Sequence, residues 1–409
     1  MKREKFLLII TLLVAVFIVA YPKPPEEEDV IVNPYEQHPI DWPSLADSPW
    51  PMLHHDPQFT SRSNYPGPEN GVIFRKVEMG VSFGSVVIGF DSTAFIGSTQ
   101  SFYSFNYNGD ILWEQTNIGT YSTPIVAYDS VVYIPSSFGC MSLLPNGENQ
   151  WEYIAQASIW ALGFNVDKEG NLYFVDEAST LTALADNGVA LWQLNDPRFN
   201  GDADAAPAFA PDGATLYLQG NTVAILAVDI ETRGINWTFG EESLFSSPVI
   251  DNEGNLYFIP GARHSLDSLR SFYSINPEGE INWQYEFNCA LVWDNTEATI
   301  DHDGNVYFAT DTLYAFQNDG VLKWKYGFEP GVRNGSSLTC DANNVIYVGA
   351  QKESTGENQI MAINPDGTLL WLIRDSEERY LGPAPALADD GTLFFPTYNN
   401  YPGKLLIIK

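Results

Sequence analysis

The sequence is short of basic residues, and this shortage narrows the partners the protein can have. Its 409 residues include 20 lysines and arginines against 52 aspartates and glutamates, so the formal net charge at pH 7 is -32. Such a surface repels nucleic-acid phosphates and anionic lipid headgroups. We therefore expect no nucleic-acid partner, and no docking of the folded part onto a membrane.

Cysteine is scarce as well. The three cysteines, Cys140, Cys289 and Cys340, lie far apart in the sequence and cannot all pair. We expect buried free thiols, with one long-range disulfide as the alternative in an oxidising compartment.

Long apolar runs are absent except at the N-terminus, where Phe6 to Tyr21 form 16 uncharged residues after the basic start MKREK. The run is long for the core of a signal peptide and short for a membrane-spanning helix. Residues 1–21 are thus a cleaved signal peptide or an uncleaved anchor over residues 6–21. Both alternatives export the rest of the chain to the periplasm, the cell surface or the medium. Residues 22–69, rich in proline and acids, are expected to be an extended linker and lead-in segment.

Residues 70–409 contain a repeat. Seven tryptophans recur at intervals of 38 to 47 residues, each closing a short run that begins with a glycine turn. A second run after an Asp/Asn/Gly turn precedes each of them by about half a period, as in DKEGNLYF (167–174) and DHDGNVYF (301–308). It contains tyrosine in all copies but the first, FDSTAFI (90–96). This period is typical of propeller blades. The repeat tryptophans, which we assign to stability, are Trp113, Trp151, Trp192, Trp237, Trp283, Trp324 and Trp371.

Each period predicts four antiparallel strands. In the third strand a small residue lies between larger apolar ones, and close packing suggests that the tryptophan ring fills the space above it. These small residues are Ser104, Ser142, Ala183, Ala227, Ser274, Ala315 and Ala362.

The eighth copy is incomplete. The chain ends at residues 404–409, which align with a third strand, while residues 70–77 form a glycine turn and β-prone run without a partner. Pairing these two segments would complete the blade and remove an exposed sheet edge. The sequence therefore predicts an all-β protein, an eight-bladed β-propeller of four-stranded antiparallel blades whose ring is closed by N- and C-terminal strands.

The Gly-x-x-x-Trp repeat with its Tyr strand resembles the repeats of pyrroloquinoline-quinone (PQQ) type propellers, which include quinoprotein alcohol dehydrogenases and BamB-type outer-membrane assembly lipoproteins. The resemblance covers residues 70–409 and implies the fold, because members share the blade without sharing a site. The dehydrogenases would imply an adjacent cysteine pair, which is absent here. The lipoproteins would imply a cysteine just after the apolar run, and none occurs before Cys140. We expect no cofactor. Residues 48–63 resemble a segment of exported propellers of this group.

Two clusters have the residue types of metal sites. Asp301-x-Asp303-Gly304-Asn305 is similar to the start of a calcium loop, but related strings before other Tyr runs favour a hairpin turn. His54, His55 and Asp56 could be metal ligands, but neighbours on an extended segment point in opposite directions. We expect this segment to pack on the propeller. None of the five histidines lies near a nucleophile-elbow motif.

Loop lengths predict where binding occurs. The first and third connections of each blade are uniform short turns, so variation in length concentrates on the opposite end, called here the variable-loop face.

The expected function is an exported, non-enzymatic binding or scaffold protein, a monomer with a protein or glycan partner. The alternative is a quinone-dependent dehydrogenase or hydrolase with a site at the central channel. The residues expected on the binding face are Trp160, Arg198, Arg263, Arg270, Trp293, Arg333, Arg374 and Arg379.

Overall fold

A computed structural model describes residues 33–409 except 83, 121, 160–162, 202–204, 262–268, 289–296, 378–380, 383 and 398–402. Residues Tyr35–Lys409 form one compact unit. Within the described residues, no helix is long and apolar enough to span a membrane. The expected signal or anchor at residues 1–21 lies outside them.

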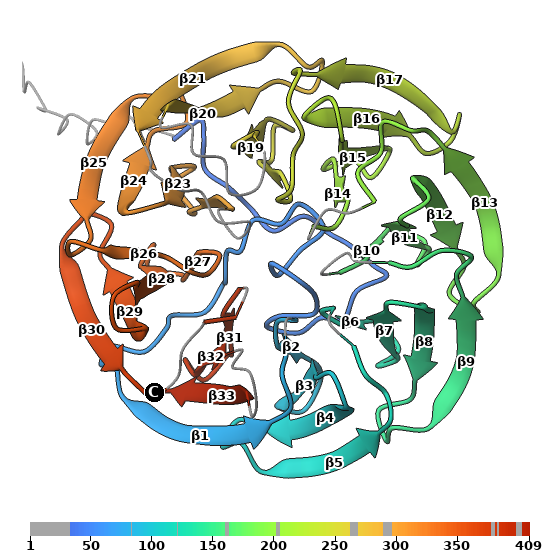
Figure 1. Ribbon diagram of the computed structural model, residues 1–409, viewed down its shortest axis with the longest axis horizontal. Coiled ribbons are helices and arrows are strands. Elements are labelled where there is room, and N and C mark those ends of the chain that lie inside the picture. Colours follow the sequence, from blue (N-terminus) through green and yellow to red (C-terminus); the bar gives the residue numbers. More distant parts are fainter. Residues whose placement is uncertain are drawn as a thin grey trace, which may run out of the picture. The chain divides into compact units, whose positions relative to one another are not determined.

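The unit is a ring of eight antiparallel sheets (Figure 1). Blades 1 to 4 are β2 (Val87–Ile88), β3 (Thr93–Gly97), β4 (Ser101–Asn106) and β5 (Ile111–Thr116); β6 (Ile125–Val126), β7 (Val132–Ser136), β8 (Gly139–Leu143) and β9 (Asn149–Ile154); β10 (Asn165–Val166), β11 (Leu172–Val175), β12 (Thr180–Leu184) and β13 (Ala190–Asn195); β14 (Ala208–Phe209), β15 (Thr215–Gln219), β16 (Ile225–Asp229) and β17 (Gly234–Phe239).

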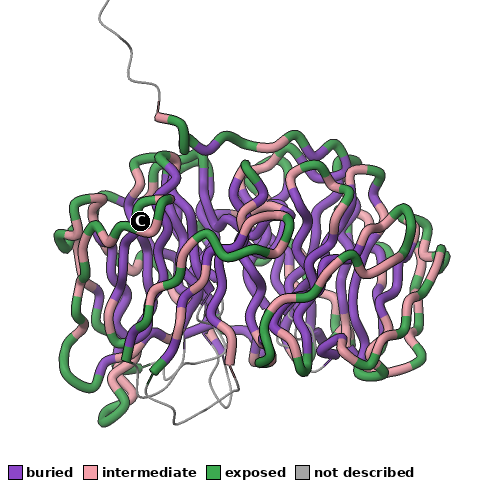
Figure 2. Tube along the Cα trace, turned by 90° about the horizontal axis from the view of Figure 1, so that it is seen from above, coloured by how far each residue is buried: buried purple, intermediate pink, exposed green. Residues whose placement is uncertain are grey.

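Blades 5 to 8 are β18 (Val249–Ile250), β19 (Leu256–Phe258), β20 (Leu269–Ile275) and β21 (Ile281–Asn288); β22 (Thr299–Ile300), β23 (Val306–Ala309), β24 (Thr312–Phe316) and β25 (Leu322–Gly327); β27 (Thr339–Cys340), β28 (Ile346–Lys352), β29 (Glu357–Ile363) and β30 (Leu369–Asp375), with β26 (Val332–Asn334) added to β28; β31 (Ala386–Leu387), β32 (Leu393–Pro396), β33 (Gly403–Ile408) and β1 (Ile73–Met79). The first strand of each blade is innermost. The middle strands are buried, and exposed residues gather at the two ends of the blades and around the outside (Figure 2).

Ring closure follows the expected splice. Strand β1 pairs antiparallel with β33, with Val77 opposite Leu405 and Met79 opposite Gly403. The indole nitrogen of Trp371 in blade 7 donates to the carbonyl oxygen of Pro68 at 2.9 Å. In other blades, the acceptor for this nitrogen lies in the turn before the outer strand of the next blade. The eight-bladed, terminally closed ring is therefore confirmed.

Each repeat tryptophan lies directly across from the small residue of the third strand, as the register of Trp324 with Ala315 illustrates. On the other side of Ala315 lies Tyr307, and its ring centroid is 5.7 Å from that of Trp324. Because alanine or serine occupies the middle position, the two rings meet above it.

The repeated aspartate fixes the turn before the Tyr strand. One carboxylate oxygen of Asp301 accepts from the backbone of Asp303 and Asn305, and the other accepts from the Asn305 amide and the Tyr307 hydroxyl at 2.7 Å each. Asp167 and Asp251 make the same set of bonds. The motif thus acts as a hairpin device. No group of three or more potential ligands placed to hold a metal ion occurs among the described residues.

Residues 37–67 run through the centre of the ring, where Figure 1 shows them in blue. Residues 22–69 are expected to be an extended linker and lead-in segment, and residues 50–61 within them pack against the innermost strands. They can do so because an eight-bladed ring leaves a central channel. The apolar residues scattered among the prolines and acids of this stretch fill it, and we call residues 37–67 the channel segment.

Candidate functional site

The backbone of the channel segment accepts hydrogen bonds from the innermost strands of most blades. An innermost strand would otherwise present unpaired N–H groups to the channel. Carbonyl oxygens of the channel segment accept from equivalent N–H groups at 2.7 to 3.4 Å; the pairs are Ile88 to Trp50, Val126 to Pro51, Phe209 to Pro57, Ile250 to Gln58, Ile300 to Thr60 and Cys340 to Ser61. Residues 50–61 therefore connect blades 1, 2, 4, 5, 6 and 7.

Apolar side chains of the same stretch occupy the channel. Trp50, Met52, Leu53 and Phe59 are almost completely buried, with at most 2% of their surface exposed. Their burial makes the channel segment part of the hydrophobic core, which explains why a segment without repeat character is ordered.

The channel segment turns sharply at two places. His54, His55, Phe59 and Ser61 have φ between 52° and 78°, a region that non-glycine residues seldom adopt. Each such residue costs about 1–3 kcal/mol and persists only where its surroundings fix it. The expectation of an extended segment at His54 and His55 is therefore wrong, because the chain is left-handed at both residues. The expected packing of this segment on the propeller is what the structure shows.

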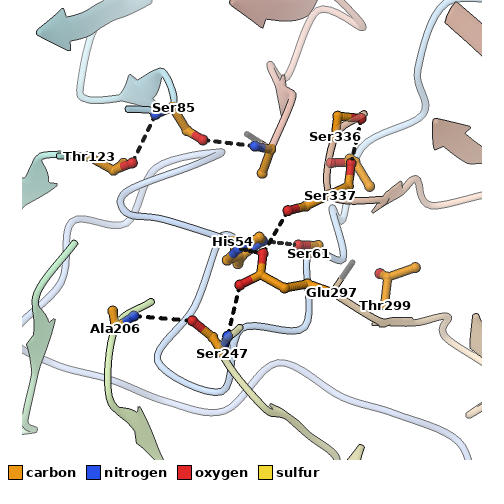
Figure 3. A network of polar contacts seen from close by, with 12 residues as sticks. His54, Ser61, Ser85, Thr123, Ala206, Ser247, Glu297, Thr299, Ser336 and Ser337 are labelled. Atoms are coloured by element: carbon orange, nitrogen blue, oxygen red, sulfur yellow. Dashed lines mark hydrogen bonds and ion pairs between the residues drawn. The ribbon is translucent and has the colours of Figure 1, made fainter. Parts of the chain in front are cut away.

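His54 forms a buried polar centre with Glu297, which precedes blade 6 (Figure 3). Its Nε2 lies 2.6 Å from Oε2 of Glu297, and its Nδ1 lies 2.7 Å from the Ser61 hydroxyl. Glu297 also accepts from the backbone N–H of Ser247 at 2.9 Å and from the Ser337 hydroxyl at 2.6 Å. This centre joins the channel segment to the starts of blades 5, 6 and 7.

Burial alone would raise the pKa of Glu297. The charge of His54 and the hydrogen bonds from His54, Ser337 and Ser247 outweigh burial, and the pKa lies below its ordinary value. The carboxylate is thus held ionised inside the protein by its partners.

Ser61, His54 and Glu297 contact one another in the order of the nucleophile, base and orienting acid of a hydrolase triad. Ser61 is fully buried, and its N–H and carbonyl are bound to His54 and Cys340. A substrate carbonyl cannot reach a hydroxyl enclosed in this way, so the three residues hold the channel segment in place. Sequence reasoning did not find Glu297, because it lies outside the repeat motifs and far along the chain from His54.

The side chain of His55 contacts other residues than that of His54. Its Nδ1 lies 3.2 Å from the carboxylate of Asp56, and its ring packs edge-on against Trp50. Asp56 also accepts from the backbone N–H and the hydroxyl of Thr60. Burial would raise the pKa of Asp56, but His55, Arg62 and Thr60 together lower it. The His-His-Asp cluster therefore divides between two polar centres.

Four of the residues expected on the binding face are described, and three of them form ion pairs. Arg198 pairs with Asp196 at 2.8 Å, Arg333 pairs with Glu353 at 3.0 Å, and Arg374 bridges Glu329 and Glu357. Arg270 is buried, so it is not an exposed contact. Trp160, Arg263, Trp293 and Arg379 lie outside the described residues. Cys140 and Cys340 are buried free thiols, and Cys289 is not described.

A quinone on the ring axis does not fit the described channel. Side chains of residues 50–59 fill it, and the sequence has no adjacent cysteine pair. We derive no redox chemistry from this site.

No protein-family model and no curated protein matches the sequence. Solved structures match the fold. BamB from Moraxella catarrhalis is 14% identical, with 83% of this chain and 99% of that chain covered and a TM-score of 0.60. A europium-containing methanol dehydrogenase is 11% identical over 87% and 90%, with a TM-score of 0.62. The C-terminal WD40 domain of Sif2 is 11% identical over 85% and 100%, with a TM-score of 0.65. The likeness to BamB and PQQ-type propellers is thus shown at the level of fold.

Proposed function

We propose that this protein is an exported, non-enzymatic propeller that binds a protein partner through its variable-loop face. The observation that carries the proposal is the occupied channel. Side chains of residues 50–59 fill the axis on which a propeller enzyme would need its site. Binding on the outer surface is then the use that the fold supports best.

The two ends of the ring differ in the surface they offer. The end opposite the variable-loop face carries the first and third connections of each blade, and we call it the turn end. There, repeated aspartates such as Asp301 hold the hairpins. At the variable-loop end, long connections present exposed charges of both signs, such as Arg198, Arg374 and Glu329. Surfaces that differ from blade to blade allow a specific partner to be recognised. Export is supported by the apolar run of residues 6–21 after the basic MKREK.

Charge reversal at both ends tests the proposal. Arg198 and Arg374 at the variable-loop face are 43% and 41% exposed and paired with acids. Arg75 at the turn end is 43% exposed and paired with Asp110, which makes it a matched control. We expect Arg198→Glu with Arg374→Glu to weaken capture of the partner from an envelope extract about tenfold, because interface charges steer association. Arg75→Glu should leave capture unchanged.

All three arginines are exposed, and exposed ion pairs contribute little to stability, so the variants should remain folded. Arg374→Glu faces Glu329 and Glu357 and will lose more stability than a reversal at a free site. Circular dichroism therefore accompanies the binding assay. Loss of capture in Arg75→Glu alone would assign binding to the turn end and overturn the proposal.

A further inference from the structure

The guanidinium group of Arg270 is buried, and one of its edges makes no hydrogen bonds. Arg270 is 8% exposed, and its Nε and Nη2 are inaccessible to solvent and have no hydrogen-bond partner among the described residues. A buried charge that makes no hydrogen bonds is strongly unfavourable. A group that the described part of the chain does not supply is therefore expected at this edge.

Nε and Nη2 form the fork of the guanidinium that fits a carboxylate. The same edge of Arg198 donates from Nε to Oδ1 of Asp196 at 2.9 Å and from Nη2 to Oδ2 at 2.8 Å. Two parallel bonds of this kind match the two oxygens of a carboxylate group. The fork of Arg198 is thus occupied by a carboxylate of the chain itself, whereas the fork of Arg270 has no such partner among the described residues.

Arg62, the other buried arginine among the described residues, differs in this respect. Its Nη2 donates to the carbonyl oxygen of His38 at 3.5 Å. The carboxylates of Asp56, Asp301 and Asp251 lie close enough to stabilise its charge. Burial of an arginine in this fold is therefore compensated at Arg62 and not at the fork of Arg270.

Arg270 lies at the variable-loop end of blade 5. It follows Leu269, which begins β20 and is 56% exposed, so the fork belongs to a side chain one residue inside the surface. Phe287, its register partner, is 4% exposed, and Phe272 shares its side of the strand and is fully buried. A hydrogen bond between opposite charges is stronger in such surroundings than in water.

The loop after β19 lies against the other end of the guanidinium. A Cβ on Gly261 would lie 1.9 Å from Nη1 of Arg270 and 3.5 Å from Oε2 of Glu242. The Gly261 N–H donates to the Ser243 carbonyl at 2.9 Å, which holds the loop in place. Glu242 is exposed and makes no hydrogen bond to the fork. Its nearby negative charge disfavours ligands with several negative charges, so we expect a ligand that brings one carboxylate.

We propose that the Nε–Nη2 fork of Arg270, at the variable-loop end of blade 5, is a binding site for a single carboxylate group. The carboxylate belongs either to a small ligand or to a protein partner, and the two sources share the same chemistry at the fork. This inference goes beyond the proposed function and does not depend on it, because the site can be tested with no partner present.

Sodium formate is the probe, because the fork is covered and formate is the smallest carboxylate. The melting temperature is compared in formate and in sodium chloride of equal concentration. We expect formate to raise that of the unaltered protein by about 2 °C over chloride, since a ligand that binds only the folded chain stabilises it. Arg270→Met removes the fork and should abolish the rise. Arg75→Met is the matched control and should keep it, because Arg75 is exposed and paired with Asp110.

In chloride, Arg270→Met should melt no lower than the unaltered protein, because an apolar side chain of similar length replaces an unpaired buried charge. Arg270→Lys keeps the charge without the planar fork and should lose most of the formate effect. An equal rise in Arg270→Met and in the unaltered protein would overturn the inference. Equal destabilisation in chloride by Arg270→Met and by Asp267→Asn would also overturn it, because a carboxylate of the chain itself would then occupy the fork.

Capture from an envelope extract identifies the source of the carboxylate. Weaker capture by Arg270→Met would assign the carboxylate to the protein partner, and unchanged capture would assign it to a small ligand. The two proposals can fail separately. Normal capture by the Arg198/Arg374 variant would reject the proposed function and leave the formate result standing, whereas loss of the formate effect would reject only the site at Arg270.

Discussion

His54→Ala is expected to destabilise the protein by about 3–5 kcal/mol, because it leaves the Glu297 carboxylate buried without its partner. The carboxylate is 7% exposed and lies 2.6 Å from the imidazole. The loss should appear as a lower midpoint of urea unfolding, followed by tryptophan fluorescence. We expect a single cooperative transition, since the channel segment contacts most of the blades.

His55→Ala is the control for this prediction. His55 is adjacent in sequence and also next to a carboxylate, but its side chain is 16% exposed against 2% for His54, and Asp56 keeps Thr60 and Arg62 as partners. The loss should therefore be smaller than for His54→Ala. A double variant, His54→Ala with Glu297→Gln, should be less destabilised than the sum of the single variants, because no unpaired charge remains. Equal losses for His54→Ala and His55→Ala would contradict the account of the buried centre.

The pair of His54 and Glu297 also predicts how the free energy of unfolding depends on pH. The folded pKa of Glu297 lies below the ordinary value of 4.5, so its contribution to stability is present above about pH 4.5. It is lost as the pH falls through the lower folded pKa. The free energy of unfolding of Glu297→Gln should therefore change less between pH 6 and pH 3 than that of the unaltered protein. Parallel pH profiles would show that Glu297 is not held ionised by its partners.

Trp324→Ala is expected to cost about 3 kcal/mol, the lower end of the range for removing a large aromatic side chain from a core, since Trp324 is half-buried. Its ring packs on Tyr307, and its indole nitrogen donates to the Pro365 carbonyl of blade 7 at 2.9 Å. The substitution therefore removes a contact between adjacent blades. Urea unfolding gives the free energy, and an unchanged midpoint would contradict a stabilising role.

Gly367, which lies against the Trp324 ring, offers a second variant. Gly367 has a φ of 85°, and a Cβ there would lie 2.8 Å from the Trp324 ring. Gly367→Ala should thus destabilise the protein alone, and by less when Trp324 is already alanine, because the clash is gone and only backbone strain remains. Trp324→Phe, which keeps a ring but loses the indole N–H, should fall between the unaltered protein and Trp324→Ala. Strictly additive losses would mean that the ring and the turn do not touch.

The repeat could be predicted from the sequence because seven blades share a tryptophan nine or ten residues after a small third-strand residue, as Trp324 follows Ala315. The missing outer strand of blade 8 pointed to residues 70–77. The channel segment could not be predicted in this way, because it is present once and each of its residues meets a different blade. His54 and Glu297 illustrate this, since nothing in either local sequence indicates the other.

Amide hydrogen exchange of the propeller with and without its captured partner tests the central claim most directly. We predict that the partner slows exchange at the variable-loop face, around Arg198 and Arg374. The Asp-containing turns at the opposite end and residues 50–61 in the channel should be unaffected. Slower exchange confined to those turns, or faster exchange in residues 50–61 on binding, would contradict an account in which a filled channel supports a partner on the variable-loop face.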